Sequence, residues 1–278
     1  MPASPDTRAQ AIAAIDARAD ALVELQRQIV RIPSPNPPGD TRDLVAFLAG
    51  RLKHLGIEHR IVDPNPEWPN LIATIRGNGP GKRLVLNDHL DHFPAEDASR
   101  WTYPPYEAAL VEGKIYGRGV SDNKNGICGM LFELELLNEM RDHWSGEIVA
   151  TFVSDEETFG PYGARYLLEH CPEVMGDAVL SAECSGGDTV LFGEKGLIWL
   201  ELEVTGPGGH AAYTHLYPNA AQIASRIIVE AEQEIHGYKV DMNPELKAAL
   251  AKPTPDRIRV EPAVVAAYLG TEAYETAA

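Results

Sequence analysis

The sequence has few cysteines, no long apolar run and no recognisable leader. Its three cysteines, Cys128, Cys171 and Cys184, are too scattered for a disulfide framework or a thiolate metal site, so we expect free thiols. No apolar stretch approaches the roughly 20 residues that span a bilayer, and the first residues lack the basic-then-apolar order of a signal peptide. The sequence therefore predicts a cytoplasmic protein.

Basic residues are also scarce. Lys and Arg total 24 against 41 Asp and Glu, which gives a formal net charge of -17. A surface of this sign repels phosphate groups, so we expect neither nucleic acid nor an anionic membrane as a partner. The surplus carboxylates instead offer oxygen ligands for cations. With 44% hydrophobic residues, the chain can bury a core in one large or two modest domains.

Helical and strand patterns alternate along the first two thirds of the chain. Apolar residues at helical spacing predict helices over residues 6–30, 41–55 and 127–140. Apolar stretches bounded by turn residues predict strands over residues 57–62, 71–76, 83–87, 146–154 and 177–181. This order favours an α/β fold with a mixed sheet and helices on both faces.

Acidic residues and a histidine follow three of these strands: His89 and Asp91, then Glu156 and Glu157, then Glu183. Asp122 lies in a Gly-rich loop that enters the helix at 127–140. Each of these residues taken alone has an ordinary structural interpretation as a turn, a helix cap or a solvated side chain. Strand ends at one edge of a sheet can converge, however, and the repetition favours a common site.

One imidazole with several carboxylates and no thiolate suits a divalent cation such as Zn, Co or Mn. A bridging carboxylate can hold two ions. Of two adjacent acids, one can bind the metal while the other takes a proton from water. An acid near a ligating histidine, as Asp91 is near His89, can orient the ring. The sequence thus predicts a site for one or two divalent metals, with Zn as the first choice.

Five motifs carry a resemblance to a known family: residues 88–94, 117–126 and 155–157, Glu183, and residues 206–211. In this order they resemble the motifs of the co-catalytic metallo-aminopeptidase/aminoacylase family, which contains glutamate carboxypeptidase, acetylornithine deacetylase and succinyl-diaminopimelate desuccinylase. The similarity runs from about residue 23 to residue 231. It implies a catalytic domain over residues 1–196 and a partial α+β lid, or dimerisation, domain over residues 197–278.

The resemblance also implies a role for each matched residue. His89 and Glu183 would hold one metal, Asp122 would bridge, and Glu157 would hold the second metal. Asp91 would orient His89, and Glu156 would be the general base. His210, in the lid, would reach the active site across a homodimer and help to hold the developing oxyanion. The lid would begin with a strand near residues 198–205 and continue through a helix over residues 219–235.

Four polar residues depart from the family pattern: Asp88, His92, Asn123 and Asn125. They stand where the family usually has glycine or small apolar residues. Three interpretations stay open for them: recognition of an unusual substrate, an altered metal count, or hydrogen bonding among themselves.

The C-terminal region departs as well. After a possible lid strand at residues 257–261 no further histidine motif follows, although family chains supply a last metal-binding histidine there. We therefore expect a truncated or frame-shifted member with an incomplete lid, in which the second metal binds weakly.

The predicted function is hydrolysis of an amide-type C–N bond in a small, carboxylate-bearing substrate, by metal-activated water with Glu156 as base. Two alternatives remain. The first is an aminohydrolase acting on an aryl or other non-peptide C–N bond, which the polar residues Asp88 and His92 would accommodate. The second is a non-catalytic remnant that binds metal or dimerises.

Overall fold

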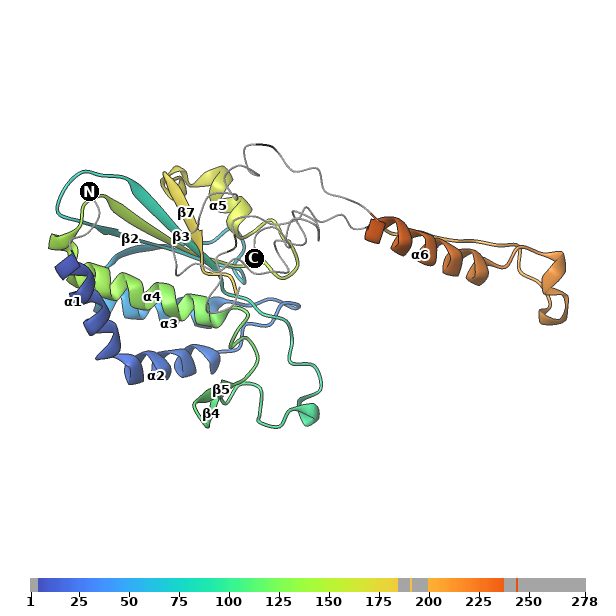
Figure 1. Cartoon of the computed structure of the whole chain (residues 1–278), viewed down its shortest axis with the longest axis horizontal. Helices are drawn as coiled ribbons and strands as arrows, with labels where there is room; N and C mark the ends of the chain where they lie inside the picture. Colours follow the sequence, from blue (N-terminus) through green and yellow to red (C-terminus); the bar gives the residue numbers. More distant parts are fainter. Residues whose placement is uncertain (1–4, 185–190, 192–199, 238–243, 245–278) are drawn as a thin grey trace. The chain divides into compact units, whose positions relative to one another are not determined.

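The computed structural model describes residues 5–184, 191, 200–237 and 244 (Figure 1). The chain divides into two compact units, Met1–Cys184 and Ser185–Ala278, and each is described by itself. Within the described residues, no helix has the length and apolar character needed to cross a membrane.

The first unit is built on a five-stranded mixed sheet in the order β1-β2-β6-β3-β7. Its strands are β1 (Glu58–Val62), β2 (Asn70–Arg76), β3 (Arg83–His89), β6 (Glu147–Val153) and β7 (Ala178–Ser181). β1, β2 and β6 pair antiparallel, whereas β3 runs parallel to β6 and to β7. The five strands expected from the sequence all form, and the mixed α/β sheet is confirmed.

The position of each strand in the sheet explains its composition. β6 lies between β2 and β3, and all its residues after Glu147 are buried, so it reads as a continuous apolar run. β7 lies at the edge, and all four of its residues are exposed. A separate hairpin of β4 (Ala109–Val111) and β5 (Lys114–Tyr116) precedes the helix α4.

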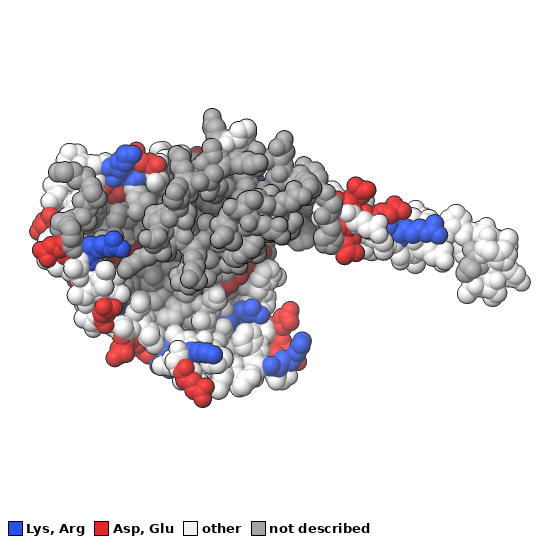
Figure 2. Space-filling view, viewed as in Figure 1, with Lys and Arg blue, Asp and Glu red and all other residues white. Residues whose placement is uncertain are grey.

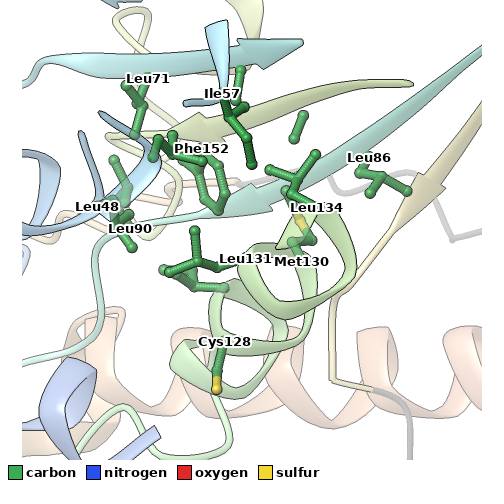
Figure 3. Packing of buried hydrophobic residues seen from close by; sticks show 14 of the residues in the cluster. Leu48, Ile57, Leu71, Leu86, Leu90, Cys128, Met130, Leu131, Leu134 and Phe152 are labelled. Carbon is green, nitrogen blue, oxygen red and sulfur yellow. The ribbon is translucent and has the colours of Figure 1, made fainter. Parts of the chain in front are cut away.

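Three helices cover one face of the sheet: α2 (Ala19–Val30), α3 (Arg42–His54) and α4 (Lys124–Glu139) (Figure 1). Leu48 of α3 and Leu131 and Leu134 of α4 are fully buried in the core shared with the sheet, together with Phe152 of β6 (Figure 3). The opposite face packs against the shorter helix α5 (Ala164–His170), through a smaller cluster that includes Leu167. Helices on both faces agree with the sequence expectation.

The N-terminal helix differs from the prediction. The expected single helix over residues 6–30 is divided at Arg18 into α1 (Pro5–Asp16) and α2. Arg18 has non-helical backbone angles, and its guanidinium pairs with Glu139 of α4. Ile12 and Ile15 of α1 are 47% and 41% exposed, so α1 does not pack on the core as expected. Only the α2 part of the apolar pattern packs into the core, where α2 lies against α4.

The second unit contains the short 3-10 helix η4 (Ala211–Leu216) and the helix α6 (Ala220–Gly237). α6 agrees with the helix expected at 219–235. The strand expected at 198–205 is wrong for residues 200–205, which have no regular secondary structure. Leu200 and Leu202 are 79% and 66% exposed there, and no strand of the described chain pairs with them. Residues 198–199 and the strand expected at 257–261 lie outside the described residues.

Acidic and basic side chains are interspersed over the face that Figure 2 shows. The first unit contains several ion pairs, among them Arg76 with Glu58 at 2.5 Å and Arg83 with Glu147 at 2.6 Å. Exposed pairs of this kind contribute little to stability. The buried apolar layer between the helices and the sheet is therefore the main source of stability for the first unit.

Leu131→Ala tests the role of this layer. The substitution leaves a cavity between α4 and the sheet, so we expect the free energy of unfolding to fall by about 2–5 kcal/mol. Urea unfolding followed by circular dichroism measures the change. The control is Leu168→Ala, whose side chain is 59% exposed and should cost much less. Equal losses for the two variants would contradict a core centred on α4.

Candidate metal centre

The end of β3 brings one histidine beside two carboxylates. His89 is the last residue of the strand and is 2% exposed. Its Nε2 lies 3.2 Å from Asp122 Oδ1 and 3.3 Å from Glu183 Oε2. Asp122 comes from the loop before α4, and Glu183 follows β7. Three residues that are distant in the sequence therefore meet at one point.

The parallel pairing of β3 with both neighbours explains this convergence. Asn87 is in register with Thr151 of β6 on one side and with Ser181 of β7 on the other. The carboxyl ends of the three strands thus open on the same edge of the sheet. Residues that come just after these strands, including Glu156, Glu157 and Glu183, are consequently brought to that edge.

Asp91 connects the histidine to the loop that carries the two glutamates. It is fully buried, and its Oδ1 lies 3.7 Å from His89 Nδ1. Its carboxylate accepts hydrogen bonds from the backbone N–H groups of Glu156 (3.2 Å) and Glu157 (3.1 Å), and from Asn36 Nδ2 (2.8 Å). Burial alone would raise the pKa of Asp91, but the nearby His89 ring and the hydrogen bonds from Asn36 and the Glu157 backbone lower it below the ordinary value. Asp91 is therefore a fixed anion beside the ring.

The two glutamates differ in their contacts. Glu157 Oε1 accepts a hydrogen bond from the Phe93 backbone at 3.1 Å, and burial together with the charge of Asp122 raises the Glu157 pKa to about 7. Burial also raises the pKa of Glu156. Within the described part of the chain, the Glu156 side chain makes no hydrogen bond; only its backbone N–H does. A carboxylate with a raised pKa and no hydrogen bond to the protein is a better proton acceptor than an ordinary, paired carboxylate.

The loop geometry rests on Asp155, which sequence reasoning missed. Its backbone adopts φ 64°, and its buried carboxylate accepts hydrogen bonds from Thr158 Oγ1 (2.9 Å) and the Tyr162 backbone (3.2 Å). A Cβ at Gly160 would lie 1.7 Å from the Asp155 carboxylate, so only glycine fits there. Asp155, Glu156 and Glu157 are three acidic residues in succession, and nothing in the sequence indicated that the first would have a structural role.

The loop that carries Asp122 is held by the residue two positions later. Lys124 is fully buried, and its Nζ donates a hydrogen bond to the Ile32 carbonyl. Burial lowers the pKa of Lys124 to about 7. The contact ties the start of α4 to the connector after α2, and so fixes the approach of Asp122 to His89.

Two of the unusual polar residues do not enter the site. His92 is fully buried; its Nε2 accepts from the Ser34 backbone (3.0 Å) and its Nδ1 donates to the Phe93 carbonyl (2.7 Å). Burial, with a smaller effect of Lys124, lowers the His92 pKa to about 4, so the ring is neutral. Asn125 is exposed, and its Oδ1 accepts from the Gly126 backbone at 2.8 Å. Both residues stabilise local backbone.

The grouped donor atoms fit a divalent cation. Ligand atoms of His89, Asp122 and Glu157 lie within 4.8 Å of one another, and so do those of Asp88, His89 and Glu183. One imidazole with several carboxylate oxygens is a donor set that Zn, Co or Mn accepts. Burial lowers the pKa of His89, but the adjacent carboxylates of Asp122, Asp91 and Glu183 outweigh burial and raise it. A hydrogen bond to His89 lowers the Glu183 pKa to about 2.

His210 belongs to the second unit. Its Nδ1 accepts a hydrogen bond from the Ala212 backbone at 3.1 Å, so it caps η4. Within the described residues, its Nε2 makes no hydrogen bond. Its function at an active site stays a prediction.

The raised pKa of His89 predicts a pH dependence for metal binding. A metal must displace the proton of the imidazolium, so affinity for Zn²⁺ should rise by roughly tenfold per pH unit near neutral pH, with release of protons. Isothermal titration in two buffers of different ionisation enthalpy measures the proton count.

The exposed His143 supplies the control. His143→Ala should leave both the affinity and the proton release unchanged, whereas His89→Ala should abolish tight binding. An affinity for Zn²⁺ that does not change with pH would contradict the assignment of His89 as a ligand.

Comparison with known structures agrees with the fold of the first unit. A metallo-carboxypeptidase of the M20 family from Sulfolobus solfataricus is 20% identical, with a TM-score of 0.58 over 88% of this chain and 62% of that one. Human carnosine dipeptidase 1 is 21% identical, with a TM-score of 0.53 over 65% and 41%. A tripeptidase from Staphylococcus aureus is 18% identical, with a TM-score of 0.52 over 75% and 55%.

This chain spans less than two thirds of the length of each of these three proteins. The model of Peptidase family M20/M25/M40 matches residues 85–275, which is more than half of the 278 residues. The matched region contains every residue of the candidate metal centre, from His89 to Glu183. The chain therefore belongs to peptidase family M20/M25/M40.

Proposed function

We propose that this protein is a metal-dependent hydrolase that cleaves an amide-type C–N bond in a small substrate carrying a carboxylate. The observation that carries the proposal is the meeting of His89, Asp122 and Glu183 beside the loop of Glu156 and Glu157. Family membership supports hydrolysis of amides, and the similar structures include a metallo-carboxypeptidase and a dipeptidase. Such proteins act on amide bonds close to a carboxylate.

The residues divide into ligands and a proton carrier. His89 and Glu183 would hold one ion, Glu157 a second, and Asp122 would bridge them. When bound, a divalent ion supplies a Lewis acid that polarises the substrate carbonyl and lowers the pKa of water. Asp91, whose Oδ1 lies 3.7 Å from His89 Nδ1, would orient the His89 ring, and it fixes the glutamate loop by accepting two backbone hydrogen bonds.

Glu156 is the proposed general base. Its carboxylate would take a proton from the attacking water and return it to the nitrogen of the leaving amine. Burial raises the pKa of Glu156 and so makes its carboxylate a stronger base. Zn is the expected metal, and Co and Mn are the alternatives. We expect one or two ions to bind.

The aminohydrolase alternative loses the observation that motivated it. It rested on Asp88 and His92 as groups for an unusual substrate. His92 bonds to backbone with both ring nitrogens, and Asp88 is 1% exposed and bonds within the protein. Neither side chain is available to a substrate in this arrangement, so amide hydrolysis is the function that we carry forward.

Activity against a panel of dipeptides and N-acyl amino acids tests the proposal. We expect turnover that a chelator abolishes and Zn²⁺ or Co²⁺ restores. Glu156→Gln should lower kcat by about 10²–10⁴-fold while the metal content stays at the wild-type value. The control Glu112→Gln changes an exposed glutamate and should keep full activity. A folded, metal-loaded wild type without turnover on any member of the panel would favour the non-catalytic alternative.

His210 and the homodimer are tested together by mixing two inactive variants. If His210 acts across a dimer, the lid of one subunit serves the site of the other. Mixed dimers of His210→Ala and Glu156→Gln then contain one complete site, so exchange of subunits should restore roughly a quarter of the wild-type activity. Gel filtration gives the oligomeric state. A monomer, or a mixture that stays inactive after exchange, would remove the role of His210 in trans.

A further inference from the structure

Two buried polar residues behind the candidate metal centre have no role in the proposed chemistry. Asp88 is 1% exposed and Asn123 is fully buried. Buried polar groups are costly unless they are hydrogen-bonded, so a pair at this depth calls for an explanation from its contacts.

The two side chains form a chain of hydrogen bonds that leads to Glu183. Asp88 Oδ1 accepts from the His89 backbone N–H at 2.9 Å and from Asn123 Nδ2 at 2.5 Å. The same Nδ2 also donates to Glu183 Oε2 at 3.0 Å. One amide NH₂ group therefore bridges two carboxylates.

The position of Asn123 makes this use of its side chain unusual. Asn123 is the N-cap residue of α4, where an asparagine side chain ordinarily accepts from the first backbone N–H groups of the helix. No such capping bond forms. The amide is turned instead toward Asp88 and Glu183, and the opposite flip would set its oxygen against two carboxylates.

Asp88 is placed to hold Asn123 rather than a metal. Its Oδ1 already accepts two hydrogen bonds. Its Oδ2 is buried without a hydrogen-bond partner and packs against the first turn of α4, where a Cβ on Gly126 would lie 2.2 Å from it. Although Asp88 lies near His89 and Glu183, both of its oxygens are engaged with or packed against protein groups.

Glu183 needs a hydrogen-bond partner that fixes its side chain. It lies beyond the end of the edge strand β7, and its side chain is 34% exposed. Its contacts with Cys184, which include a hydrogen bond from the backbone N–H to Oε1 at 2.9 Å, are local. Without Asn123, the carboxylate has no contact in the described chain, apart from His89 itself, that holds it over the site.

We propose that Asp88 and Asn123 are positioning residues that fix Glu183 as a metal ligand. Asp88 Oδ1 accepts from Asn123 Nδ2 and so sets the orientation of the Asn123 amide. Asn123 in turn directs Glu183 Oε2 to within 3.3 Å of His89 Nε2. This inference rests on the proposed function insofar as that function requires a metal at His89 and Glu183.

Titration of the full-length chain with Co²⁺, followed by visible absorption, tests the inference without an activity assay. Asn123→Leu keeps the approximate shape but removes the bridging NH₂ group. We expect Co²⁺ affinity to fall by about 10–100-fold and the absorption of the bound ion to change, because Glu183 is released.

The conservative variant at the other position separates geometry from charge. In Asp88→Asn the new amide oxygen can still accept from His89 and Asn123, so affinity should stay within about threefold of wild type. Asp88→Leu removes the acceptor and should weaken Co²⁺ binding. The double variant Asp88→Leu/Asn123→Leu should bind no more weakly than Asn123→Leu alone, because Asp88 acts through Asn123.

Asn125→Leu is the matched control, since Asn125 is an exposed asparagine of the same loop. It should bind Co²⁺ as wild type does. Circular dichroism of the metal-free proteins checks folding. If the leucine variants do not fold, Asn123→Ser, which is too short to reach Glu183, should show the same loss of affinity.

Two results would overturn the inference alone: wild-type affinity in Asn123→Leu or in Asn123→Ser, or a loss in Asp88→Asn as large as in Asp88→Leu. The second result would mean that the charge of Asp88 acts on the metal directly. A folded wild type that binds no Co²⁺ would overturn both this inference and the proposed function. Wild-type binding without hydrolysis would leave the inference standing and remove only the proposed function.

Discussion

The parallel pairing of β3 with β6 on one side and β7 on the other is the constraint on which the site depends. It brings the carboxyl ends of three strands to one edge, where His89, Glu183 and the glutamate loop follow within a few residues. The apolar layer between the sheet and the helices α3 and α4 holds this arrangement. Because α4 packs on the same face, the loop at its start carries Asp122 to the same edge. Polar chemistry is thus concentrated where the apolar sheet ends.

The concentration of carboxylates at this edge sets the electrostatics of the site. Asp91 stays ionised because it accepts several hydrogen bonds, whereas burial and neighbouring acids raise the pKa values of Glu156 and Glu157. His89, as an imidazolium, compensates part of the negative charge when no metal is present. A divalent cation would take over that compensation. The same arrangement therefore explains both the need for a cation and the availability of a base.

Much of the fold could be predicted from the sequence, and so could the gathering of His89, Asp122 and Glu183 at one edge of the sheet. The strands read as apolar runs, and the ligands follow them directly. What could not be predicted depends on partners across the fold. The apolar pattern before residue 30 gave no sign that Arg18 would pair with Glu139 and divide the helix. The hydrogen-bond partners of Asp88 and His92 could not be predicted either. Asp88 bonds to a side chain in the loop before α4, and His92 bonds to backbone near residue 34.

The burial of Lys124 has a consequence for how the loop of Asp122 can be observed. Most lysines offer a reactive amine to the solvent, but this amine is fully buried and bonded to the Ile32 carbonyl. An acylating reagent can reach it only when the start of α4 separates from the connector after α2. The rate at which this one lysine is acylated therefore reports how often that part of the chain opens locally. The acylation rate of Lys124 is thus a measure of the local opening that would move Asp122 away from His89.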